Sequence, residues 1–146
     1  MNPRSLASLG GHPIHPMLVP FPIACFVGAF VTDLAYWQSA NVMWETFSAW
    51  LLTAGLIMAA LATLTGLVDF IGSGRIRGLG QAWFHVTGNV IAIGLSLINA
   101  FVHSRDGYTA VVPTGLILSG LVVLILFFTG WMGWAMVYRH RVGVAN

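Results

Sequence analysis

A polar stripe runs along the third apolar segment of the sequence. Its positions are separated by four, three, four, three and four residues, a spacing that places them on one face of a helix. The remainder of this segment is apolar, as lipid and neighbouring helices require of a membrane-spanning helix. The pattern predicts that something polar, or something that needs ligands, lies along the stripe, which consists of His85, Asn89, Ala92, Ser96, Asn99 and His103.

The two histidines of the stripe differ in their expected chemistry. His85 lies about one turn into the expected helix, where the positive end of the helix dipole favours the neutral imidazole that binds a metal or heme iron. Asn89 follows it by one turn on the same face. His103 lies at the C-terminal end, where the dipole favours imidazolium and a capping role suffices. We therefore expect His85, with Asn89 beside it, to contribute to a cofactor site.

A second pair of histidines lies in a Pro-rich N-terminal strap, residues 12–22. Its Pro residues lack a backbone N–H and disfavour helix in the residue before them, so His12 and His15 are predicted to be extended. Pro20 and Pro22 are predicted to break or kink the next turn. A helix that began only at Pro22 would be too short to span a membrane, so the strap is expected to enter the membrane as partly irregular chain. Its alternative role is an N-terminal cap.

Two acidic residues lie near predicted helix C-termini, where the helix dipole disfavours negative charge. Asp69 can form an ordinary ion pair with Arg75 or Arg77. It can also orient a ligand histidine or serve as a ligand itself. For Asp33 the best candidate partner is His103.

The composition predicts an all-α integral membrane protein. Hydrophobic residues make up 58% of the chain and charged residues 7%, and the mean hydropathy is +0.85, whereas soluble domains carry roughly a quarter charged residues. Four segments are long enough to cross a bilayer, residues 17–37, 47–71, 81–103 and 114–138. We expect a single domain, residues 1–146, that forms a four-helix transmembrane bundle with a partly irregular N-terminal strap.

The arginines predict the orientation of this bundle. Five of the six, Arg4, Arg75, Arg77, Arg139 and Arg141, lie on the side that holds both termini, and only Arg105 lies on the other. The positive-inside rule therefore places both termini in the cytoplasm. Because the basic residues form no cluster that would follow phosphates, we expect no nucleic-acid partner.

A weak internal repeat relates the two halves of the chain. Placing His15 over His85 also places Asp33 over His103, and the triplets ending at Gly66 and Gly130 resemble each other. Such parallel repeats would be related by an axis along the membrane normal. The axis would make His15 and His85 face each other near the cytoplasmic boundary.

Several of these residues together resemble a known family, the bacterial membrane proteins catalogued as domain of unknown function 2231. The resemblance covers roughly residues 10–105 and has the His-Pro strap as its most specific part. The remaining motifs are residues 21–23, Asp33, residues 65–69, and His85 with Asn89. The resemblance implies a bacterial inner membrane protein without an assigned activity. Some members look to be joined to Rieske-type iron–sulfur domains, which implies a redox setting.

Three functions remain open from the sequence. In the first, His15 or His12 and the helical His85 bind one heme b near the cytoplasmic face, and the protein passes electrons to a redox partner protein or a quinone. In the second, His12, His15, Asp69 and His85 bind a divalent metal ion, with Zn, Fe or Cu as candidates. In the third, the protein is a cofactor-free assembly or transport module. Small residues of the fourth span would allow a homodimer, namely Ser119, Gly120, Gly130 and Gly133.

Overall fold

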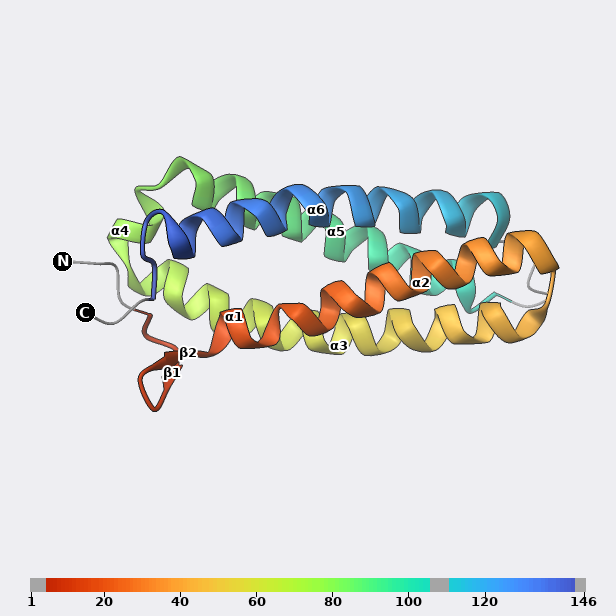
Figure 1. Ribbon diagram of the computed structural model, residues 1–146, viewed down its shortest axis with the longest axis horizontal. Helices are drawn as coiled ribbons and strands as arrows, with labels where there is room; N and C mark the ends of the chain where they lie inside the picture. The colour runs from red at the N-terminus through yellow and green to blue at the C-terminus, as the bar shows by residue number, and fades with distance from the viewer. Residues whose placement is uncertain (1–4, 106–110, 144–146) are drawn as a thin grey trace.

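The computed structural model describes residues 5–105 and 111–143, which form a bundle of four long helices (Figure 1). All four helices are long and apolar enough to cross a membrane. The first span comprises α1 (Ile14–Leu18) and α2 (Pro20–Ser39), and the second is α3 (Val42–Gly72). The third is α5 (Gly80–His103), and the fourth comprises η1 (Val111–Gly115) and α6 (Leu116–Tyr138). The prediction of an all-α, four-span membrane protein is confirmed. Arg4 lies outside the described residues.

The bundle has two distinct ends. The terminal end holds the first and last described residues and α4 (Gly74–Arg77). It also holds a short two-stranded β-ribbon of β1 (Ser8–Leu9) and β2 (His12–Pro13). The opposite end, the hairpin end, holds the tight connection between α2 and α3. There Ala40 adopts a left-handed conformation with φ of 51°, and the side chain of Asn41 accepts a hydrogen bond from the backbone N–H of Met43 to cap α3.

The helices pack so that the two halves of the chain are equivalent. Helix α2 packs against α3 and α6, and α5 packs against α6 and α3, so α2 and α5 lie across the diagonal of the bundle. Small and apolar side chains fill the centre, where all four helices meet. The buried members are Phe26, Ala29, Leu52, Ala59, Ala92, Val122 and Leu126. Outside this core, large apolar residues such as Trp50 and Phe127 are exposed, as expected of a surface that contacts lipid.

The strap differs in part from its prediction. His12 is extended, as predicted, but His15 lies in helix α1, and the prediction that it is extended was wrong. The physical reason is that Pro16 occupies the first turn of α1, where a backbone N–H has no partner within the helix. The predicted break is reduced to one residue between α1 and α2, Val19, whose backbone stays helical and whose N–H donates to the His15 carbonyl. Pro20 and Pro22 still cannot donate to the carbonyls one turn earlier.

Candidate functional site

His15 of α1 and His85 of α5 meet at the terminal end of the bundle. Their ring centroids lie 6.2 Å apart and the rings are nearly perpendicular, with an interplanar angle of 87°. Both side chains are partly buried. The structure therefore brings together one histidine from each half of the chain, in the facing arrangement that the internal repeat predicts.

Each of these rings is anchored by its Nδ1 atom to the backbone of a neighbouring helix. His15 Nδ1 lies 2.8 Å from the carbonyl oxygen of Ala62 in α3, and His85 Nδ1 lies 2.8 Å from that of Thr129 in α6. A carbonyl oxygen only accepts hydrogen bonds, so both Nδ1 atoms must carry the proton. In the neutral imidazole the Nε2 atom then keeps its lone pair, which is the state in which histidine binds a metal.

Glycines one helical turn after the two anchors make room for the rings. A Cβ atom at Gly66 would lie 2.7 Å from His15 Nδ1, and a Cβ at Gly133 would lie 3.1 Å from His85 Cε1. Gly66 follows Ala62 by one turn of α3, just as Gly133 follows Thr129 by one turn of α6. The two halves thus hold their histidines by the same device, a carbonyl and a glycine.

The other sequence-predicted ligands do not join this pair. His12 is exposed on β2. Asn89 donates its side-chain N–H to the His85 carbonyl at 2.7 Å, within the same helix. Among the described residues no group of three or more His, Cys, Asp or Glu is arranged to hold a metal ion. The four-ligand cluster of His12, His15, Asp69 and His85 is therefore not assembled.

Asp69 binds the N-terminal segment instead. Its carboxylate accepts hydrogen bonds from Ser5 Oγ at 2.7 Å, from the Leu6 N–H at 2.6 Å and from the Ala7 N–H at 2.9 Å. Arg77, one of its two expected partners, donates to the carbonyls of Phe70 and Ile71 at the end of α3. Asp69 thus fixes the chain that leads into the strap.

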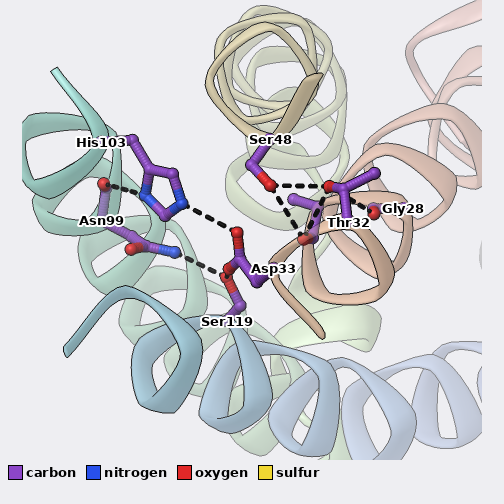
Figure 2. A network of polar contacts seen from close by, with 8 residues as sticks. Gly28, Thr32, Asp33, Ser48, Asn99, His103 and Ser119 are labelled. Carbon is purple, nitrogen blue, oxygen red and sulfur yellow. Dashed lines mark hydrogen bonds and ion pairs between the residues drawn. The ribbon is translucent and has the colours of Figure 1, made fainter. Parts of the chain in front are cut away.

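A second polar cluster lies at the hairpin end, where α2, α5 and α6 meet (Figure 2). His103 Nε2 lies 2.8 Å from Asp33 Oδ1, with both side chains fully buried, so the predicted pairing of these residues is confirmed. Ser119 donates its hydroxyl to Asp33 Oδ2 at 2.5 Å, and Asn99 donates its side-chain N–H to Ser119 Oγ at 2.7 Å. We call these four residues the Asp33 network.

Comparison with known proteins identifies the family of this chain. A family model described as "Predicted membrane protein (DUF2231)" matches residues 11–146. The chain belongs to this family. It is also 27% identical, over 124 residues, to a lysylphosphatidylglycerol biosynthesis bifunctional protein, LysX, of Mycolicibacterium gilvum (strain PYR-GCK). That match covers 84% of this chain but only 10% of the longer protein. No solved structure matches the chain.

Two glycines that border the histidine rings of this DUF2231 chain, Gly66 and Gly133, were assigned other roles from the sequence, in the repeat and in a dimer contact. The repeat was aligned on Gly66 and Gly130, but the structure pairs Gly66 with Gly133, because these are the glycines that contact a histidine ring. Gly130 has open space where its Cβ would be. A useful sequence pattern would have been a glycine one turn after a small residue in both the second and the fourth span.

Proposed function

We propose that this protein is a small membrane cytochrome in which His15 and His85 bind the iron of one heme b through their Nε2 atoms. The single observation that carries the proposal is the pair of Nδ1 anchors, which orient both rings and, in the neutral imidazole, leave Nε2 as the ligand atom. A ligand histidine in proteins usually has its other ring nitrogen held by a carbonyl or carboxylate in this way. A heme bound here would supply a one-electron carrier to a partner protein or quinone.

The spacing of the two rings supports this assignment. Two imidazoles that bind one metal from opposite sides at about 2.0 Å have centroids on the order of 6 Å apart. The observed separation is 6.2 Å. The centroid separation thus matches that of two imidazoles bound to one metal.

The number of ligands favours heme over a bare metal ion. A porphyrin supplies four nitrogens and needs only two axial ligands, whereas Zn, Fe or Cu bound by side chains alone prefers three or more. Of the predicted ligands His12, His15, Asp69 and His85, only His15 and His85 come together in the described part of the chain. The divalent-metal alternative would need ligands beyond these two.

Two open surface pockets lie near the pair, and neither is lined by His15 or His85. A pocket of about 390 Å³ between α3 and α5 is lined by Thr63, which follows the His15 anchor, and by Val90. A second pocket of about 350 Å³ is lined by Pro16, which follows His15, and by Val137 of α6. Because neither ring lines a pocket, the proposal is supported by the Nδ1 anchors and the ring separation.

A cofactor-free membrane module is the second candidate function. It is favoured by the match to one tenth of a bifunctional lysylphosphatidylglycerol biosynthesis protein, in which a segment like this chain is a small part of the whole. In this reading the histidine pair connects α1, α3, α5 and α6 and has no ligand.

An optical spectrum of the purified protein, produced in the membrane with added heme, separates these functions. We expect an intense Soret band that is lost in His15→Ala and in His85→Ala, because each variant removes one axial nitrogen. His12→Ala is the matched control, since His12 is exposed and should leave the spectrum unchanged. Elemental analysis for Fe, Zn and Cu accompanies each sample. A colourless wild-type protein without iron refutes the heme proposal, and bound Zn or Cu in its place supports the bare-metal alternative.

A further inference from the structure

The Asp33 network contains one proton whose place is shared between two residues. His103 Nδ1 lies 3.0 Å from the carbonyl oxygen of Asn99, an acceptor only, so Nδ1 carries a proton. The hydrogen bond between His103 Nε2 and Asp33 Oδ1 then contains one further proton, on the nitrogen or on the oxygen. Ser119 completes the set by donating to Asp33 Oδ2.

Packing alone does not explain such a cluster inside a membrane span. Replacing a buried ion pair by apolar residues is often neutral or stabilising, and ionisable residues within spans usually mark functional sites. Asp33 is 0% exposed, and the acidic residue Glu45 of α3, at 2% exposed, is also buried at this end. Glu45 lies within electrostatic range of both Asp33 and His103. Two carboxyl groups and one imidazole are therefore buried near one another at this end.

Two buried polar atoms beside the network have no hydrogen-bond partner in the described chain. They are Asn99 Oδ1 and Ser96 Oγ, which belong to residues one turn apart on α5 that are both 0% exposed. Buried polar groups left in this way are typically satisfied by internal water. Gly115 borders the same place, since a Cβ there would lie 3.4 Å from Asn99 Oδ1 and 2.8 Å from His103 Cε1.

We propose that the Asp33 network is a hydrated proton-binding site that exchanges protons with the hairpin side of the membrane. A proton taken up from water converts the shared-proton pair into an imidazolium and a carboxylic acid, and its release returns it to water, with no other bond changed. Internal water on Asn99 Oδ1 and Ser96 Oγ belongs to the site.

The surroundings of the site define its access. Glu45 of α3 lies within electrostatic range of the site, Arg105 lies two residues beyond the end of α5, and α6 contributes the hydroxyl of Ser119. Towards the terminal end, the apolar core around Ala92 and Val122 separates it from the His15–His85 pair. The proposal is independent of heme, because none of these contacts involves that pair.

The test is a pH titration of the ¹⁵N-histidine-labelled protein in lipid nanodiscs, followed by NMR, with His103 assigned from its missing signal in His103→Gln. We expect the His103 Nε2 signal to titrate while Nδ1 stays protonated. Ser119→Ala removes the hydroxyl donated to Asp33 and should move the midpoint by about one pH unit. Ser48→Ala is the matched control, because Ser48 is equally buried at this end but bonds only to Thr32 and the Ala29 carbonyl (Figure 2).

Three results would overturn the proposal. A constant His103 signal together with a constant ¹³C signal of the Asp33 carboxyl group, over the whole range in which the protein is folded, would identify a locked structural pair. In a ¹⁵N-asparagine-labelled sample, absence of magnetisation transfer from water to the Asn99 side chain would contradict the proposed internal water. A proton leak through vesicles above that of protein-free vesicles would contradict closure by the apolar core. The wild-type titration decides the first point even where a variant fails to fold.

Discussion

Gly66 is the position at which one added methyl group would act most directly on His15. A Cβ atom there would lie 2.7 Å from His15 Nδ1 and 2.9 Å from Cε1, far inside the ordinary contact distance of about 3.5–4.0 Å. Because Gly66 lies within the long helix α3, the backbone cannot easily retreat, and the His15 ring must leave its place. The hydrogen bond from His15 Nδ1 to the Ala62 carbonyl would then be lost.

The expected cost of Gly66→Ala follows from these two effects. Overpacking typically costs about 1–3 kcal/mol, and a lost hydrogen bond adds about 0.5–1.5 kcal/mol. The free energy of unfolding should therefore fall by about 2–4 kcal/mol. Thermal unfolding of the purified protein, followed by circular dichroism, should show a Tm lowered by roughly 10 °C.

Gly130→Ala provides the matched control for this measurement. It also adds one methyl group within a spanning helix, but no atom lies within 4 Å of the new Cβ. Since alanine is a better helix former than glycine by about 1 kcal/mol, the control should be as stable as the wild type or slightly more stable. Equal Tm values for the two variants would refute the reasoning, because His15 would then not be held against Gly66.

Two further predictions concern the orientation of the bundle and the strap. In a Cys25→Ala background, Ser104→Cys should be labelled from outside the cell by a membrane-impermeant reagent. Ser73→Cys should not be labelled. The reverse pattern would contradict cytoplasmic termini. Asp69→Asn replaces a charged acceptor by a weaker neutral one, so hydrogen exchange at the Leu6 and Ala7 amides that it binds should accelerate while cofactor content stays unchanged. Loss of cofactor at normal yield would show instead that Asp69 acts on the histidine pair.

The sequence predicts well those features that depend on local spacing. Apolar segments of sufficient length correspond to the four spans, and the polar stripe correctly places Ser96, Asn99 and His103 on the buried face of one helix. The pairing of Asp33 with His103 is also predictable, because few groups of opposite charge are available inside a membrane to compensate a buried acid.

Features that depend on tertiary contacts were not accessible in the same way. The role of Asp69 could not be predicted without knowing that residues 5–7 lie against the end of α3. Sequence proximity indicated Arg75 and Arg77 as its partners instead. The helical conformation of His15 also depends on a tertiary contact. Pro16 disfavours this conformation locally, but the hydrogen bond to the Ala62 carbonyl in α3 holds the His15 ring in place.

The two ends of the bundle use equivalent positions of the repeat for different chemistry. At the hairpin end the equivalent residues are Asp33 and His103, an acid and a base that satisfy each other through one shared proton. At the terminal end they are His15 and His85, and each donates a hydrogen bond from its Nδ1 to a carbonyl oxygen. In the neutral imidazoles both Nε2 lone pairs are then left without a hydrogen-bond donor in the described chain. A heme iron bound to both would therefore join His15 and His85, as the shared proton joins Asp33 and His103.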